Sequence, residues 1–131
     1  MSHHRETIQA TGAPAAAGPY SHAVASGGLL FCSGQTPIDP ATGELVGGSI
    51  GEQAARCLEN LSIVCAAAKA KLADAVRISV YVTDMSTFKE VNEAYATFFE
   101  SDPPSRTTVG VAALPLGAEA EMDAIVALIG G

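Results

Sequence analysis

A row of apolar residues at helical spacing, preceded by a helix-capping pattern, most strongly limits what this chain can fold into. Ser49, followed three residues later by Glu52, forms the pattern of a capping box, which opens a helix. Apolar side chains then recur at steps of three and four, which places them on one face of a helix of about twenty residues. They are Ala54, Leu58, Leu61, Cys65, Ala68 and Leu72. A helix with one apolar face needs a second layer of structure to bury that face.

The segments around this helix predict that the second layer is a sheet. Residues 77–84 alternate apolar and polar side chains, which indicates a strand with one buried face. The stretch 35–48 is rich in proline and glycine and predicts turns with a small hairpin. The remaining predicted strands are 5–10, 28–33, 106–114 and 119–128, the last two joined by a turn at 115–118.

A second helix is predicted between residues 86 and 102. Ser86 is its candidate N-cap, and Asp102 before Pro103 marks its end, because the residue before a proline avoids the α region. Its predicted apolar face consists of Phe88, Val91, Tyr95, Phe98 and Phe99.

The order strand, strand, helix, strand, helix, strand, strand predicts an α+β protein with two helices packed on one face of a mixed sheet. The other face then has no helix to cover it, and association of subunits is the simplest way to bury it. At 131 residues the chain is expected to form a single domain, 1–131, with residues 1–4 as a disordered tail.

The charge balance and the cysteines narrow the class of protein. Seven basic against fourteen acidic residues give a net charge of −7, so a nucleic acid is not expected as a constitutive partner. The three cysteines form no CxxC pair, and an odd count fits free thiols in a reducing compartment. Neither a signal peptide nor an apolar run of membrane-spanning length is found, so a soluble cytoplasmic protein without membrane contact is expected.

The common catalytic motifs are missing from the sequence. It contains no P-loop, no GxGxxG and no GxSxG pattern. His22 directly follows Ser21, and neighbours in sequence point apart, so they do not form a nucleophile–base pair by themselves. Cys32 lies in an apolar strand, where a raised thiol pKa leaves it inert. No metal site is expected.

Arg106 is the residue that points most clearly to a function. From Glu90 to the C-terminus the chain has seven acidic residues and this one basic residue. In a strand, Arg106 shares its face with Thr108 and Gly110, which leaves room for a ligand. A guanidinium there is suited to bidentate binding of a carboxylate. The alternative is a solvated arginine at the start of a strand.

Glu121 is the candidate acid or base on the last predicted strand. It shares one face with Glu119 and Asp123, and the alternative reading is a solvated acidic face. If 115–118 is a hairpin loop, Glu121 lies on the face of Arg106, six positions away, or roughly 20 Å. The two residues are therefore expected to meet across a subunit boundary.

Two polar residues complete the candidates derived from pattern alone. Asn92 borders the apolar face of the second helix, where a buried amide needs partners; it either bonds nearby backbone or binds a ligand. Tyr20 lies in a loop from which its hydroxyl reaches a pocket, or its ring packs against the core.

Six segments, taken in order and with their spacing, resemble the RidA/YjgF family of enamine/imine deaminases, also called L-PSP endoribonucleases. The likeness runs from about residue 7 to residue 128. The segments are APAAAGPYSHAV, FCSGQTPIDPATGELV, EQAARCLENL, VYVTDMSTFKEVNEAYATFF, PPSRTTV and EMDAIVAL.

The resemblance implies a chorismate-mutase-like fold, assembled as a homotrimer with clefts between subunits. It implies cofactor-independent hydrolysis of 2-imino acids of the 2-aminoacrylate type to 2-keto acids and ammonia. Arg106 then holds the substrate carboxylate, and Glu121 positions water or shuttles protons. The further site positions are catalytic Tyr20 and substrate-binding Ser33, Gly34, Asn92 and Thr108.

The chain departs from the better-known members just after the arginine. Thr108 stands where they often have a cysteine, while Gly110, Ala113 and Leu116 replace charged residues. Two rival functions remain: a regulatory trimer that binds small carboxylates without turnover, and a single-strand RNA endoribonuclease. The acidic balance and the 5% aromatic content disfavour the second.

Overall fold

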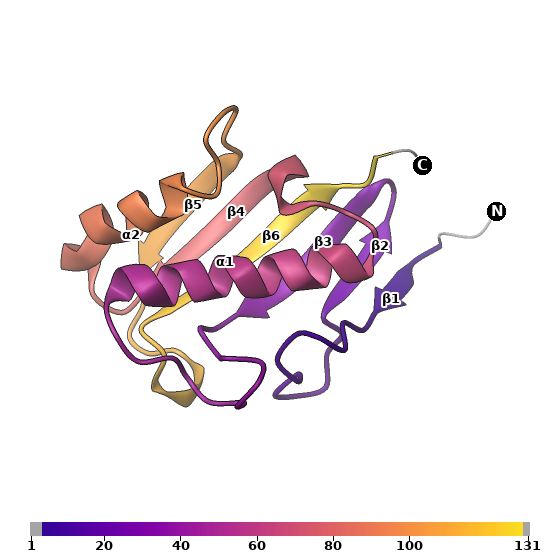
Figure 1. The fold of residues 1–131 in the computed structure, drawn as a ribbon. Helices are drawn as coiled ribbons and strands as arrows, with labels where there is room; N and C mark the ends of the chain where they lie inside the picture. Colours follow the sequence, from indigo (N-terminus) through magenta and orange to yellow (C-terminus); the bar gives the residue numbers. More distant parts are fainter. Residues whose placement is uncertain (1–3, 130–131) are drawn as a thin grey trace.

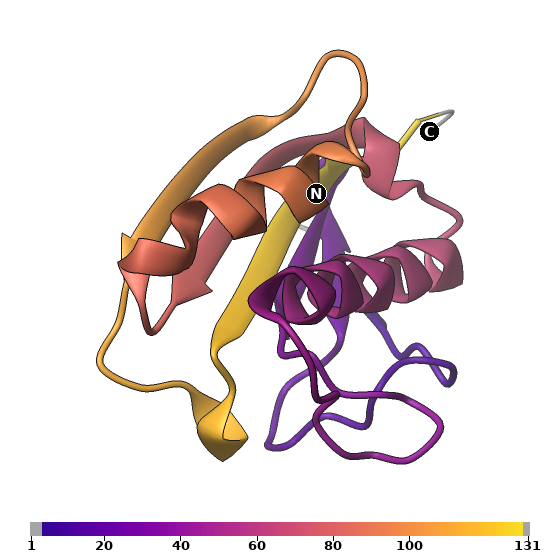
Figure 2. The ribbon, with the colours of Figure 1, turned by 60° about the vertical axis from the view of Figure 1, so that its left-hand side comes forward.

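Two helices lie on one face of a six-stranded sheet in the computed structural model, which describes residues 4–129 (Figure 1). Helix α1 is Ile50–Ala67 and helix α2 is Phe88–Ala96. The turned view in Figure 2 shows both helices on the same side of the sheet, as the sequence predicted. The strands are β1 (Glu6–Ile8), β2 (Ala23–Ser26), β3 (Leu29–Gln35), β4 (Ala75–Val82), β5 (Ser105–Gly110) and β6 (Ala120–Ala127).

The capping box predicted at the start of α1 is confirmed. The Ser49 hydroxyl accepts a hydrogen bond from the Glu52 amide at 3.2 Å, and the Glu52 carboxylate accepts one from the Ser49 amide at 3.2 Å. The apolar stripe is wider than predicted, because Cys57, which is not among the predicted stripe residues, is also fully buried. Its thiol lies 3.7 Å from the carbonyl oxygen of Ala120, so α1 packs directly over β6.

The predicted limits of the second helix are wrong at both ends. A 3-10 turn, Met85–Thr87, precedes α2, and Asp84 rather than Ser86 caps it, since the Asp84 carboxylate accepts the Ser86 amide at 2.9 Å. The helix ends at Ala96, well before Asp102. A tightened turn ends it, in which the Phe98 amide bonds the carbonyl three residues back.

The expected hairpin between the last two strands does not form. Strand β5 pairs in parallel with β4, while β6 lies between β3 and β4 and is antiparallel to both. The reason is the helix between β4 and β5, because a strand–helix–strand crossover returns the chain parallel to its first strand. Strand β5 therefore becomes an edge, and the 3-10 turn Pro115–Gly117 belongs to the connection that leads back to the centre.

No strand was predicted at residues 23–26, where the structure forms β2. It forms a hairpin with β3 through Gly27 and Gly28, whose φ angles are +61° and +80°. A two-residue turn of this kind favours glycine at both positions, so the Gly-Gly pair was the available signal. The small hairpin predicted within 35–48 is confirmed by the bridge between Ile38 and Leu45.

The sheet has one covered and one uncovered face. Strands β4 and β6 bury alternate residues under the helices, among them Ile78, Val80 and Met122. On the opposite face Phe31 and Val109 remain 43% and 40% exposed. Within residues 4–129, no helix is both long and apolar enough to cross a membrane. The expected disordered tail, 1–4, lies outside the described residues except for His4, whose carbonyl accepts the Ser26 hydroxyl at 3.2 Å.

Candidate functional site

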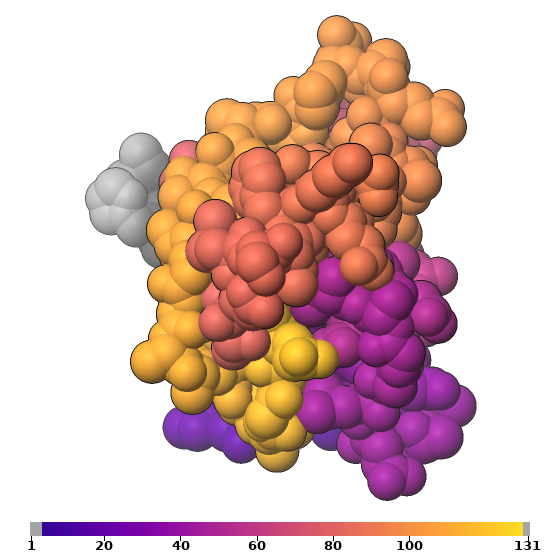
Figure 3. Space-filling model, turned by 90° about the vertical axis from the view of Figure 1, so that its left-hand side faces the viewer, coloured from indigo at the N-terminus to yellow at the C-terminus, as the bar shows by residue number. Residues whose placement is uncertain are grey.

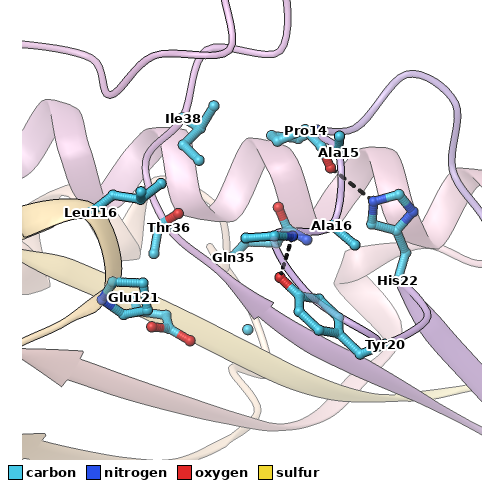
Figure 4. A pocket seen from close by; sticks show the side chains of 13 residues that line it. Pro14, Ala15, Ala16, Tyr20, His22, Gln35, Thr36, Ile38, Leu116 and Glu121 are labelled. Atoms are coloured by element: carbon cyan, nitrogen blue, oxygen red, sulfur yellow. Dashed lines mark hydrogen bonds between the residues drawn. The ribbon is translucent and has the colours of Figure 1, made fainter.

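A cavity of about 270 Å³ opens where β3 ends beside β6 (Figure 4). Three of the predicted site residues, Tyr20, Gly34 and Glu121, line it together. The rest of the wall comes from the loop before β2, the segment after β3 and the connection before β6. Those residues are Pro14, Ala15, Ala16, Ala17, His22, Gln35, Thr36, Ile38, Pro115 and Leu116.

A bulge in β3 brings Gly34 against Glu121. Cys32 pairs with Ala124 and Gln35 with Met122, so three residue steps on β3 face two on β6. The extra residue turns Gly34 toward the Glu121 carboxylate, and a Cβ placed on Gly34 would collide with the Glu121 Oε2 atom. Any larger side chain at position 34 would therefore push the Glu121 carboxylate out of the place it occupies beside the backbone.

The environment of Glu121 favours proton exchange. Its carboxyl lies partly out of solvent in the cavity wall, and burial, followed by the nearby negative charge of Asp123, raises its pKa above the ordinary value. A carboxylate with a raised pKa is a better general base and a better proton shuttle near neutral pH.

Replacing Gly34 with alanine is expected to lower any activity that depends on Glu121 by about 10- to 100-fold, because a displaced catalytic group loses its alignment. The measurement is kcat/KM for the reaction proposed below, beside a thermal unfolding curve. Gly47→Ala is the matched control, since a Cβ there meets nothing within 4 Å. Equal activity of the two variants would contradict the assigned role of the Gly34–Glu121 contact.

Tyr20 and Ser33 have different positions relative to the cavity. Tyr20 is 46% exposed, and its hydroxyl accepts the Ala17 amide at 3.1 Å, so the ring stands in the wall rather than in the core. Ser33 does not line the cavity; its hydroxyl donates to the Ser21 carbonyl at 2.7 Å and ties that loop to β3.

The remaining predicted residues gather at a second place, on edge strand β5 under α2. The Arg106 guanidinium donates to the Asn92 side-chain oxygen at 2.6 Å. It stacks over the Tyr95 ring, 4.6 Å from its centroid, and lies 5.6 Å from the Phe88 centroid. A cavity of about 340 Å³ adjoins it, lined by Asn92, Tyr95, Ala96, Phe99, Pro103, Pro104 and Arg106.

Arg106 has no carboxylate partner among residues 4–129, where the only salt bridge is Arg56–Glu59 at 3.7 Å. The guanidinium has five N–H donors, and Asn92 takes one of them. Nearby, the buried Thr108 hydroxyl oxygen also has no partner in the described part of the chain. The β5–α2 edge thus presents a cation and a hydroxyl with unused bonding capacity, and Figure 3 looks onto it, with β5 in orange.

The prediction that Arg106 and Glu121 share one face of the sheet is wrong. Arg106 pairs with Ile78, which is buried under the helices, whereas Glu121 pairs with Tyr81, on the uncovered side. The prediction assumed pairing of β5 with β6, and β4 lies between them instead. A single chain therefore places the candidate residues in two groups on opposite faces, which we call half-sites below: Tyr20, Gly34 and Glu121 form one group, and Asn92, Arg106 and Thr108 the other.

Comparison with known proteins assigns the family. A family model described as Endoribonuclease L-PSP matches residues 10–128. The chain belongs to the RidA/YjgF family. It is 42% identical over 121 residues to the mouse protein named 2-iminobutanoate/2-iminopropanoate deaminase, covering 92% of this chain and 90% of the mouse protein.

Solved RidA-family structures share the fold throughout. The RidA structure from the Antarctic bacterium Psychrobacter sp. PAMC 21119 superposes with a TM-score of 0.89 at 41% identity, covering 93% of this chain and 98% of that one. The E. coli TdcF structure with bound serine gives a TM-score of 0.88 at 35% identity, with coverage of 93% and 98%. The α+β architecture predicted from the sequence is thus confirmed as that of the RidA/YjgF family.

The thiols are not part of either half-site of this RidA/YjgF chain. Cys32, Cys57 and Cys65 are free and buried. The pKa of Cys32 is raised, first by its hydrogen bond with Cys65 and then by burial, which agrees with the inert thiol predicted. In the described residues no group of three or more His, Cys, Asp or Glu side chains is placed to hold a metal ion.

Two residues that shape the site were missed in the sequence. Asn60 on α1 is fully buried, and its amide donates to the carbonyls of Ile38 at 2.9 Å and Thr36 at 3.2 Å, which fixes the cavity wall after β3. His22 is buried in the wall of the cavity, whereas in the sequence it was weighed only as a base for Ser21. An amide next to the apolar stripe of α1 was the available signal for Asn60.

Proposed function

We propose that this chain is a cofactor-independent deaminase that hydrolyses 2-imino acids of the 2-aminoacrylate type to 2-keto acids and ammonia. The observation that carries the proposal is the Arg106 guanidinium, which is positioned by Asn92 and has no carboxylate partner within residues 4–129. Such a group is suited to bind the carboxylate of a small substrate. Similarity to the mouse protein named as a deaminase supports the same reaction.

The proposed active unit is a homotrimer with sites between subunits. The two half-sites lie on opposite faces of one chain, so a second copy is the simplest source of the missing half. The uncovered sheet face, with Phe31 and Val109 exposed, supplies apolar surface for that association. In this assembly the Arg106 edge of one subunit would stand over the Glu121 cavity of its neighbour.

The proposed chemistry needs proton transfer and orientation. Arg106 holds the substrate carboxylate, and water attacks C2 of the imine while Glu121 removes a proton from the water and returns it to nitrogen. The C2–oxygen bond forms as the C=N π pair moves to nitrogen, which gives a carbinolamine. Glu121 then carries the hydroxyl proton to nitrogen as the C–N bond breaks. The hydroxyl oxygen becomes the keto oxygen, so the products are ammonia and a 2-keto acid. Fixed orientation and general base catalysis supply the rate gain.

The test is a titration of purified protein into a serine or threonine dehydratase reaction that contains semicarbazide. Semicarbazide traps the imine, so a deaminase lowers the rate of semicarbazone formation and speeds the appearance of the 2-keto acid. A rate of semicarbazone formation that stays the same across the titration would contradict the proposal.

A second candidate function is binding of a small carboxylate without turnover, and the serine in the TdcF structure favours it. It predicts saturable binding of 2-ketobutanoate by calorimetry with no change in the trapping assay. Binding together with a change in trapping supports the deaminase.

A further inference from the structure

His22 is the buried ionisable group of the cavity wall that the proposed mechanism does not use. The residue is 5% exposed and directly precedes β2. Its Nδ1 atom lies 2.9 Å from the Ala10 amide nitrogen, and its Nε2 atom lies 2.8 Å from the Pro14 carbonyl oxygen. Figure 4 shows the second bond, beside Ala15 and Ala16 in the wall. Both ring nitrogens thus form hydrogen bonds with the backbone of one loop, residues 10–20.

These two partners fix the protonation of the ring. A backbone amide only donates, so Nδ1 must be the unprotonated nitrogen that accepts the Ala10 bond. A carbonyl oxygen only accepts, so Nε2 must carry the proton that is donated to Pro14. The arrangement is complete only when the imidazole is neutral and in this tautomer, and a charged ring would turn an N–H toward the N–H of Ala10.

The loop held by this ring forms one wall of the cavity over Glu121. Its other hydrogen bonds within the described chain are short-range, such as the Ala13 amide to the Ala10 carbonyl at 3.0 Å and the Ala17 amide to the Tyr20 hydroxyl at 3.1 Å. The backbone of His22 itself is anchored to β3, because the Ser33 amide donates to its carbonyl at 3.0 Å. The imidazole therefore connects a locally bonded loop to the sheet.

We propose that neutral His22 is a positioning residue that holds the loop of residues 10–20, and with it Tyr20, in place over Glu121. Protonation of the ring removes the Ala10 bond and releases this wall, so that the site loses its shape in acid. This inference rests on the proposed function for its effect on catalysis, whereas the protonation state and the hold on the loop are independent of it.

Few ionisable groups are found among the described residues that line the two cavities beside His22. The cavity on one side of His22 contains Tyr20 and Glu121, and Glu121 is the only acidic side chain in its wall. A second cavity on the other side is lined, besides His22, by Gln9, Ala10, Thr11, Ala13, Ala15 and Ala16, none of which titrates. Glu121 is accordingly the acidic group of this cavity whose own protonation has to be separated from that of His22.

The matched pair of variants is His22→Gln and His22→Leu. Glutamine offers one acceptor and one donor and does not titrate, so it is expected to keep kcat/KM within about threefold of the parent at pH 8. Leucine makes neither bond and is expected to lower kcat/KM about tenfold or more, which corresponds to the loss of one or two hydrogen bonds. His4→Gln, at an exposed position, is the control for removal of a histidine.

The pH profile separates positioning from mere stability. In the parent protein, log(kcat/KM) is expected to fall in acid with a slope of 1 from Glu121 and to drop by about one further log unit as His22 becomes charged. In His22→Gln only the fall from Glu121 remains, and the further drop is expected to disappear. The same total drop in His22→Gln and the parent would overturn the proposal.

A measurement without turnover decides the same question if no deaminase activity is found. Nitrogen-15 NMR of the histidine ring is expected to show Nδ1 unprotonated and Nε2 protonated at pH 8. Exchange of the Ala10 amide, corrected for its intrinsic pH dependence, is expected to accelerate when the ring becomes charged and to lose that response in His22→Gln. A ring that carries its proton on Nδ1 at pH 8 would overturn the proposal. So would an Ala10 amide whose exchange rate does not change when the ring becomes charged.

Discussion

Replacing Arg106 with alanine is expected to lower kcat/KM for 2-imino acids by about 100- to 1,000-fold, because removal of one partner of a hydrogen-bonded charge pair costs about 3–4 kcal/mol. Most of this loss should be an increase in KM, since the substrate carboxylate is bound in both the ground state and the transition state. The dehydratase–semicarbazide assay measures it, and calorimetry with 2-ketobutanoate measures the same loss as weaker binding.

Two further variants make the Arg106 result specific. Arg106→Lys keeps the charge but not the planar fork that bonds a carboxylate twice, so an intermediate loss is expected. Lys89→Ala removes an exposed positive charge from α2, the helix that also carries Asn92, and should leave kcat/KM unchanged. An Arg106→Ala protein as active as Lys89→Ala would exclude Arg106 as the carboxylate anchor.

Replacing Glu121 with glutamine is expected to lower kcat by about 100- to 10,000-fold, the usual range for removal of a general acid–base group. Binding of 2-ketobutanoate should persist, because the amide keeps the size of the side chain and Arg106 is untouched. This separation of kcat from binding distinguishes Glu121 from Arg106. Glu59→Gln, at an exposed carboxylate on α1, is the matched control for loss of a negative charge. Full activity of Glu121→Gln would contradict the proton-shuttle role.

The raised pKa of Glu121 gives the sign of two pH effects. The carboxylate must be charged to accept a proton, so activity is expected to fall as the pH drops through this raised pKa. The folded state also holds the Glu121 proton more tightly than the unfolded state does. The stability linked to that proton is fully present below the unfolded pKa, about 4.3, and is lost as the pH rises through the folded pKa. Glu121→Gln should therefore raise the unfolding temperature at neutral pH and not below pH 4.

Local features of the fold could be predicted from the sequence, whereas strand partners could not. The capping box at Ser49 and the alternation in β4 depend on residues a few positions apart, and the structure confirms both. The position of β6 between β3 and β4 depends on contacts between strands that are far apart in the sequence. A turn signal at 115–118 carries no information about that choice, so it was mistaken for a hairpin.

The same distinction applies to the candidate site. Strand parity placed Arg106 and Thr108 on one face, and the structure confirms it. The contact between Gly34 and Glu121 depends on a bulge that no local pattern marks. The hydrogen bond between Arg106 and Asn92 was not predicted, because one residue lies on a strand and the other on a helix, and no local pattern relates the two.

If the proposed trimer forms, the separation of the two half-sites by the sheet has a genetic consequence. In the proposed trimer each subunit would give its Arg106 edge to one neighbour and its Glu121 cavity to the other. An inherited defect in one half-site would silence a single active site per affected subunit, and the intact face would still serve the adjoining chain. Alleles damaged in different half-sites would then compensate for each other in mixed trimers, whereas two alleles damaged in the same half-site would not.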